Sequence, residues 1–336
     1  MSVVRVAVVA PESKRGDEEY QNAARAVAYV EEAAQRGVDL VCFPEGYPGP
    51  CNGPMDSGGR LKTTPIAILQ EAAKTHHVHV TCGNLEETGN RPETYYLCQK
   101  LISPKGEILA NYHRCQPTPP ALNMYLYNGR KHLEPGNELT VVETSVGTLG
   151  LLICSEIKVP ELARIEMLMG AEILIAPIGA APGTSEGMRF DNLGRSLTRS
   201  KFELFKAVAQ TRSIENMVYT IITANIWDTE SQWGACVTTP DGLVTDSEGA
   251  GVLYATLDMD RLRTMRNRGW SEDDFHDEPV RTLITDPAQH RDRRPDLYGL
   301  LTAPQPDAFD FFYHRENPDQ WRKAFDRVRT TGERRS

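Results

Sequence analysis

Apolar and polar positions follow two different periods along this chain, and the changes of period mark helices and strands. Residues 18–36, EEYQNAARAVAYVEEAAQR, carry apolar side chains with the 3.6-residue period of an amphipathic helix. The next segment, GVDLVCFPEG (37–46), is a glycine that closes a helix, a short apolar run and a proline. The pattern predicts a helix followed by a buried strand, and the strand ends in a polar turn at Glu45.

The same order of elements occurs twice, at a nearly constant separation. A second helix is predicted over 160–169, begun by a proline in its first turn. A glycine, an apolar strand and a proline follow it, as in the first copy. The paired segments are 37–46 with 170–179, 77–87 with 216–226, and the hairpin turns 103–108 with 239–244.

This repeat predicts the fold class. Residues 173–176 are continuously apolar, so both faces of that strand are expected to be covered. We predict one α/β domain over residues 3–260, a four-layer αββα sandwich with pseudo-twofold duplicated halves. Residues 261–336 are predicted to form a C-terminal extension or arm. Its polar helix at 317–336 is either a solvated surface element or a subunit-docking arm.

Composition and net charge limit the classes of molecule that the protein is expected to bind. The chain of 336 residues has 46 acidic and 37 basic side chains, for a net charge of −9, which argues against nucleic-acid and membrane-surface partners. The seven cysteines are scattered without a CxxC pair, which favours a reducing cytoplasm over a disulfide framework or a zinc site. We expect no apolar membrane span and a small-molecule substrate.

Three predicted strand exits carry reactive side chains: Glu45 in LVCFPEG, Arg114 in ANYHRCQPT and Cys154 in LLICSE. Cysteine is a strong nucleophile as a thiolate, and a buried carboxylate can take its proton and later activate water. A cation can stabilise the developing oxyanion, and the backbone N–H of Ser155 can complete an oxyanion hole. Taken singly, Cys154 fits a packed core thiol and Glu45 a turn cap. The combination favours catalysis.

This combination resembles the nitrilase (carbon–nitrogen hydrolase) superfamily over nearly the whole chain. The segments that carry the resemblance are VRVAVVAPE, GVDLVCFPEG, KGEILANYHRCQPT, VGTLGLLICSEIKVPELAR, GAEILIAPIG, RSIENMVYTIITAN and RRPDLYGLL. The resemblance implies an αββα sandwich that acts on non-peptide C–N bonds with a Glu-Lys-Cys set and neither metal nor cofactor. By position, Glu45 would be the base and Cys154 the nucleophile.

Two features depart from the family pattern. Arg114 stands where the family's catalytic lysine is expected, and an arginine keeps the charge but gives up no proton at working pH. The second family glutamate would fall near 128–131, where there is none, so Glu134 is a substitute only if the register shifts. The candidate substrate contacts are Tyr47, Asn128, Glu134, Ile178 and Gly179.

Three functions stay open at this point. The first is a cysteine-dependent hydrolase of a small amide or carbamoyl compound, acting through a covalent acyl-enzyme. The second is a nitrilase acting on a nitrile, since YHRCQPT and CSE resemble that branch. The third is a catalytically weakened member that binds a ligand or partner. The resemblance also implies a homodimer or higher homo-oligomer.

Overall fold

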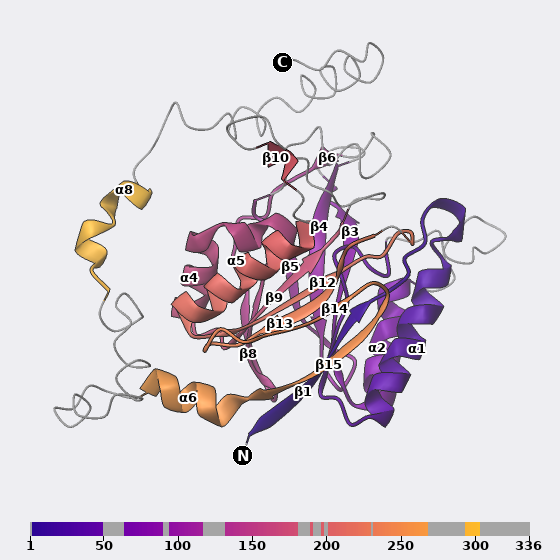
Figure 1. Cartoon of the computed structure of the whole chain (residues 1–336). Coiled ribbons are helices and arrows are strands. Elements are labelled where there is room, and N and C mark those ends of the chain that lie inside the picture. The colour runs from indigo at the N-terminus through magenta and orange to yellow at the C-terminus, as the bar shows by residue number, and fades with distance from the viewer. Residues whose placement is uncertain are drawn as a thin grey trace, which may run out of the picture.

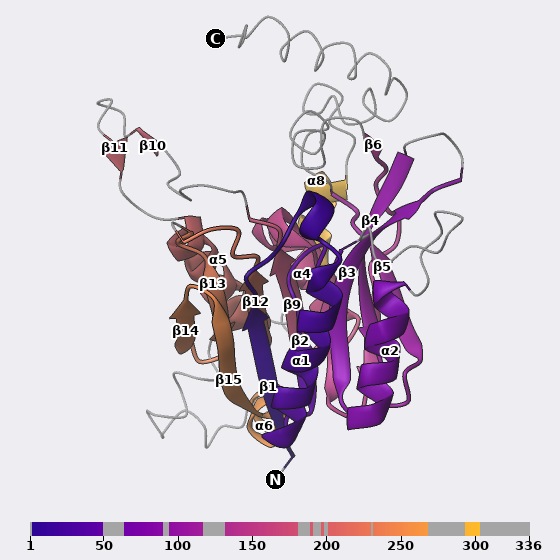
Figure 2. The same cartoon turned by 90° about the vertical axis from the view of Figure 1, so that its right-hand side faces the viewer.

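Two β-sheets lie face to face, each with a pair of helices on its outer side (Figures 1 and 2). This arrangement comes from a computed structural model that describes residues 2–49, 64–89, 94–116, 132–180, 189–190, 196–197, 201–229, 231–267 and 293–302. The four layers confirm the predicted αββα sandwich.

The first sheet has the strand order β15-β1-β2-β3-β4-β5, and β6 pairs with β4 beside this path. Strands β1, β2 and β3 are parallel, whereas β4, β5 and β15 run antiparallel to their neighbours. The strands are β1 (Val3–Ala10), β2 (Leu40–Cys42), β3 (His79–Glu87), β4 (Thr94–Ile102), β5 (Ile108–His113), β6 (His132–Leu133) and β15 (Gly251–Asp258).

The second sheet has the order β14-β13-β12-β9-β8-β7. Its strands are β7 (Val141–Thr144), β8 (Gly147–Leu151), β9 (Ile173–Ile178), β12 (Tyr219–Ala224), β13 (Gly234–Thr238) and β14 (Val244–Glu248). A separate short pair is formed by β10 (Arg189–Phe190) and β11 (Ser196–Leu197).

The two sheets repeat one pattern of pairing. In the second sheet, β8, β9 and β12 form the parallel run, and β7, β13 and β14 are antiparallel to their neighbours, as β15, β4 and β5 are in the first. The predicted duplication is therefore confirmed strand by strand.

The helices occupy matching places in the two halves. On the outer side of the first sheet lie α1 (Gln21–Gln35) and α2 (Pro65–His76), and on that of the second lie α4 (Pro160–Leu168) and α5 (Lys201–Asn216) (Figure 1). The helix predicted over 18–36 begins later than expected, because a 3-10 turn, η1 (Gly16–Glu18), precedes it. Pro160 begins α4 as predicted, where its missing N–H costs no hydrogen bond.

Alternation along β1 shows how the layers pack. Val4, Val6 and Val8 belong to the cluster between the sheets, whereas Ala7 and Val9 belong to the cluster beneath α1 and α2. All six residues of β9 are buried, which confirms that both of its faces are covered.

The chain beyond β15 begins with α6 (Met259–Asn267), which crosses the boundary predicted at residue 260. Met259 and Leu262 are fully buried, so α6 packs on the core rather than leaving it. Further along lie η4 (Pro295–Leu297) and α8 (Gly299–Thr302). The helix predicted at 317–336 lies outside the described residues. None of the helices in the described ranges is long and apolar enough to span a bilayer.

Candidate active site

Cys154 lies just past β8, where the buried strand changes into a 3-10 helix, η2 (Cys154–Lys158). Its φ is +57°, in the left-handed region that non-glycine residues seldom adopt and that is common at functional sites. The thiol is free and the residue is partly exposed.

The electrostatic surroundings of Cys154 keep its thiol protonated at rest. Burial of the thiol and, to a lesser extent, the charge of Glu45 raise its pKa to about 12, although Arg114 and the Gly179 N–H act in the opposite direction. Nearly all of the thiol therefore holds its proton near neutral pH, and nucleophilic attack needs a base.

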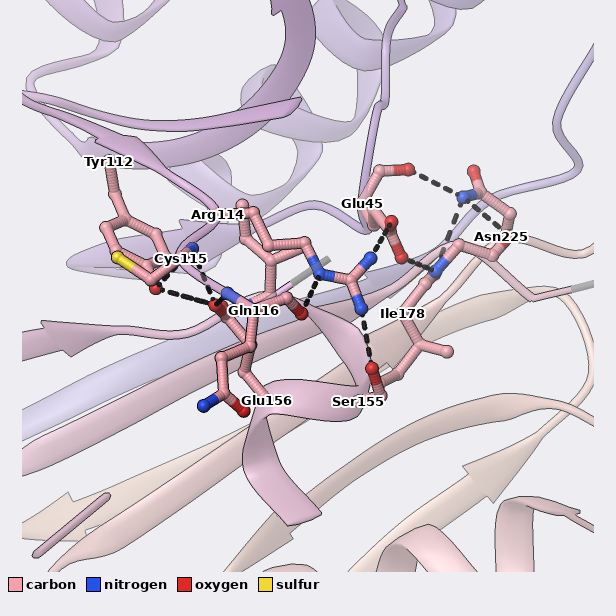
Figure 3. Close-up of polar contacts among 11 residues, drawn as sticks. Glu45, Tyr112, Arg114, Cys115, Gln116, Ser155, Glu156, Ile178 and Asn225 are labelled. Carbon is pink, nitrogen blue, oxygen red and sulfur yellow. Dashed lines mark hydrogen bonds and ion pairs between the residues drawn. The ribbon is translucent and has the colours of Figure 1, made fainter. Parts of the chain in front are cut away.

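Glu45 is the carboxylate next to this thiol. It follows β2, and its side chain is 5% exposed. Glu45 Oε2 accepts a hydrogen bond from the Gly179 N–H at 2.5 Å, and Oε1 lies 3.4 Å from Arg114 Nη1 (Figure 3). A Cβ at Gly179 would come within 2.8 Å of Glu45 Oε2, so this close approach requires glycine.

Arg114 connects Glu45 to the turn that carries the nucleophile. Its side chain is 2% exposed, and all three guanidinium nitrogens have polar contacts (Figure 3). Nη2 donates to Ser155 Oγ at 2.6 Å, and Nε donates to the Gln116 carbonyl at 3.2 Å. The structure thus brings together the three residues that the sequence predicts as catalytic, from three separate strand exits.

The predicted substrate contacts lie in different places. Ile178 ends β9 beside Gly179, and its carbonyl accepts the Asn225 N–H. Glu134 follows β6, where its N–H donates to the Tyr95 carbonyl. Asn128 lies outside the described residues. Contacts of these residues with substrate stay predictions.

Tyr47, another predicted substrate contact, lies in the helical layer of the first half. The residue is 1% exposed, its ring packs on Phe43 in the cluster beneath α1 and α2, and its hydroxyl donates to the Asn22 carbonyl. Its position just after Glu45 suggested the pocket, but the turn after Glu45 directs the ring into the helical layer.

Glu156 is a site residue that the sequence analysis missed. It is fully buried, and its carboxylate accepts hydrogen bonds from the N–H groups of Ile153, Cys115 and Gln116 at 2.7–2.8 Å. The hydroxyl of Tyr112 lies 2.9 Å from both carboxylate oxygens (Figure 3). On balance the pKa of Glu156 is raised, because burial outweighs the charge of Arg114 and these hydrogen bonds, which lower it. All of these groups can donate to the carboxylate, so the contacts fit the ionised form.

Asn225 plays a similar part on the side of Glu45. Its amide Nδ2 donates to the backbone carbonyl of Glu45 at 2.9 Å and to that of Gly179 at 3.2 Å, and its Oδ1 accepts from Ser13 Oγ at 2.6 Å. Asn225 follows β12, so it fixes three strand exits relative to one another. The sequence showed this asparagine only as part of the repeat.

A third buried carboxyl lies behind the nucleophile turn. Glu166, in α4, is fully buried, and neither of its carboxyl oxygens has a hydrogen-bond partner in the described part of the chain. Burial and the nearby charge of Glu156 raise the pKa of Glu166 well above its usual range. These surroundings therefore favour the protonated, neutral form of Glu166 over the ionised one.

The described residues include one group with metal-ligand spacing, Glu86, Cys98 and His113. Lys100 Nζ lies 2.5 Å from Glu86 Oε1, and Asn111 Nδ2 lies 2.8 Å from Glu86 Oε2 and 3.3 Å from His113 Nε2. The Asn111 amide thus bridges Glu86 and His113. We interpret the group as a polar network that ties β3, β4 and β5 together.

Comparison with known proteins agrees with this geometry. The model of the carbon-nitrogen hydrolase family matches residues 5–267. Deaminated glutathione amidase of Mus musculus is 27% identical over 293 residues, covering 82% of this chain and 79% of that protein. Human omega-amidase NIT2 is 24% identical over 259 residues, covering 74% and 86%.

A variant of the amidase from Nesterenkonia sp. AN1 has a similar fold. Its TM-score is 0.59 at 18% identity, and the match covers 81% of this chain and 95% of that one. The family model spans most of the chain, including all three predicted catalytic residues. The chain therefore belongs to the carbon–nitrogen hydrolase family, as an enzyme of the amidase/nitrilase type.

Proposed function

We propose that this protein hydrolyses a small amide or carbamoyl compound through a covalent acyl-enzyme on Cys154. The observation that carries the proposal is the grouping of Cys154, Glu45 and Arg114. The charges of Glu45 and Arg114 both shift the pKa of the thiol, and Arg114 Nη1 lies 3.4 Å from Glu45 Oε1. A protonated thiol beside a buried carboxylate is a nucleophile paired with its base.

In the first half-reaction, Glu45 takes the thiol proton as Cys154 Sγ attacks the carbonyl carbon. The oxyanion that forms is stabilised by the N–H of Ser155 and by the charge of Arg114. The C–N bond then breaks, and Glu45 returns its proton to the leaving nitrogen, so ammonia or an amine departs. Glu45 is the only one of the three side chains that carries a proton both ways, because an arginine stays protonated.

In the second half-reaction, Glu45 takes a proton from water, and the hydroxide attacks the thioester carbon. The C–S bond breaks, the acid leaves, and the proton on Glu45 returns to Cys154. No metal or cofactor has a step in this scheme. A Nesterenkonia amidase variant carries the acetamide moiety of fluoroacetamide on its active-site cysteine, which supports a cysteine adduct here.

We further propose that Arg114 takes the place of the family's lysine. Its charge lowers the pKa of Cys154, and its contacts with Glu45 and Ser155 set it beside the reacting atoms. Arg114→Lys should retain measurable turnover, whereas Arg114→Met should lose most of it. Equal turnover in the Met variant and the wild type would contradict this assignment.

The experiment that tests the proposed function measures ammonia release from matched amide and nitrile panels by the wild type and by Cys154→Ala. We expect release from amides that Cys154→Ala abolishes, and an intact-mass adduct on the wild type with fluoroacetamide. Release from nitriles alone would favour the nitrilase alternative. No release and no adduct would favour a ligand-binding member of the family.

We also propose that the protein assembles as a homodimer or a higher oligomer. Four apolar side chains on the outer surface of the second helical layer are exposed: Ile165, Leu168, Met169 and Ile214. Burying such side chains against a second copy would be favourable by about 25 cal/mol per Å² of apolar surface. Sedimentation showing only monomer at micromolar concentration would contradict this.

A further inference from the structure

The backbone segment that carries Arg114 and the turn that carries Cys154 come from different sheets. Arg114 follows β5 in the first sheet, and Cys154 follows β8 in the second. Their relative position therefore depends on contacts made across the strand exits, where a shift of about 1 Å can cost roughly 10²-fold in rate.

Glu156 makes these contacts from a single buried carboxylate. On one side it accepts the Ile153 N–H at 2.8 Å, at the start of the nucleophile turn. On the other it accepts the N–H groups of Cys115 and Gln116, the two residues after Arg114. Because the Gln116 carbonyl in turn accepts Arg114 Nε, the chain of hydrogen bonds reaches the guanidinium itself.

We propose that Glu156 is the positioning residue that holds Arg114 against the nucleophile turn. This inference rests on the proposed function, because it assigns Glu156 an effect on turnover that passes through Arg114. Among the described residues, the carboxylate of Glu156 is hydrogen-bonded neither to Cys154 Sγ nor to Glu45; it acts on two backbone segments. A carboxylate suits this place because its two oxygens accept several hydrogen bonds and can serve both segments at once.

The test compares Glu156→Gln with Glu166→Gln, a matched change of a buried carboxyl that touches neither segment in the described structure. In Glu156→Gln the amide NH₂ replaces one oxygen, so the N–H of at least one segment loses its acceptor. We expect kcat to fall about 10²-fold with little change in KM, since the lost alignment acts in the transition state. Glu166→Gln should keep the wild-type kcat and KM.

A double-mutant cycle with Arg114→Met separates positioning from a general structural role. The readouts are kcat/KM and the rate at which fluoroacetamide labels Cys154, the second being measurable when turnover is too low. If Glu156 acts through Arg114, Glu156→Gln should have little further effect once the guanidinium is gone. An equal fall in both backgrounds, or activity of Glu156→Gln within twofold of the wild type, would overturn the proposal.

If Glu156→Gln does not fold, Tyr112→Phe serves as the test variant in its place. It removes the hydroxyl that contacts both oxygens of Glu156 and leaves the carboxylate and its three N–H donors in place. We expect kcat to fall about fivefold, again only when Arg114 is present. If the wild type itself neither turns over amides nor forms the adduct, the proposed function fails; if it does both and Glu156→Gln matches it, only the positioning role fails.

Discussion

Glu156 and Glu166 are both fully buried beside the nucleophile turn, yet their surroundings differ completely. Glu156 faces the strand exits and accepts hydrogen bonds from a hydroxyl and three backbone N–H groups. Glu166 faces the packed interior behind β8 and has no partner among the described residues. The comparison teaches that burial alone does not define a carboxyl's role, because the groups that surround it decide whether it is ionised or neutral.

The largest expected effect comes from removing the Glu156 carboxylate without replacing it. Glu156→Leu would remove the acceptor of three N–H groups and a hydroxyl, buried at Ile153 and Tyr112 and part-buried at Cys115 and Gln116, and each unsatisfied buried group costs about 1–3 kcal/mol. We expect a loss of roughly 3–5 kcal/mol of stability, allowing for partial relaxation. Urea unfolding followed by circular dichroism measures it. Glu166→Leu is the control, and an equal loss in both variants would break the comparison.

The next effect is the pH dependence that Glu166 brings to stability. Its pKa is raised in the folded protein, so above the unfolded pKa of ~4.3 the folded state keeps a proton that the unfolded state releases. The unfolded state then binds fewer protons, and stability falls as pH rises, by about 1.4 kcal/mol per pH unit until the folded pKa is reached.

Glu166→Gln lacks this proton and removes the effect. We expect its stability relative to the wild type to increase as the pH rises above the unfolded pKa of ~4.3, as measured by urea unfolding at each pH. A difference that is constant with pH would mean that Glu166 is ionised in the folded protein and has a partner after all.

The sequence predicted the framework of this site but not the groups that fix it. Periodicity and the duplicated segments gave the two sheets, and reactive residues at strand exits gave Glu45, Arg114 and Cys154. Such patterns are local. The hydrogen bonds of Glu156 and Asn225 join positions far apart in the chain, and no period encodes them.

One signal could have found Glu156 and Glu166. Both acids lie in largely apolar segments, LLICSEI and IEMLM, where a charged side chain is expensive unless it has partners or stays neutral. For Tyr47, the position two residues after Glu45 said nothing about the direction in which its ring points.

A smaller effect concerns the space that Glu166 occupies. A Cβ at Gly150 would meet Glu166 Oε2 and would come within 2.9 Å of Leu174 Cδ2 and 3.1 Å of Ala171 Cβ. Gly150→Ala should therefore destabilise the fold by about 1–3 kcal/mol through overpacking. In the Glu166→Ala background the cost should fall, because the carboxyl is gone. Additive losses of stability in the double variant would show that Leu174 and Ala171, rather than Glu166, limit the space for a Cβ at position 150.

The smallest effect is expected at Ser155, which precedes Glu156 in the nucleophile turn. Ser155→Ala removes the acceptor that Arg114 Nη2 contacts at 2.6 Å, but keeps the backbone N–H assigned to the oxyanion. Ser155 is only partly buried, so water can replace the hydroxyl, and we expect a loss of at most about 1 kcal/mol in stability. Turnover should fall by about fivefold, since Arg114 keeps its contacts with Glu45 and Gln116. The measurement is kcat of Ser155→Ala and Glu156→Gln under the same conditions. An equally large loss of kcat in both variants would mean that the Ser155 hydroxyl, and not the buried carboxylate, aligns Arg114.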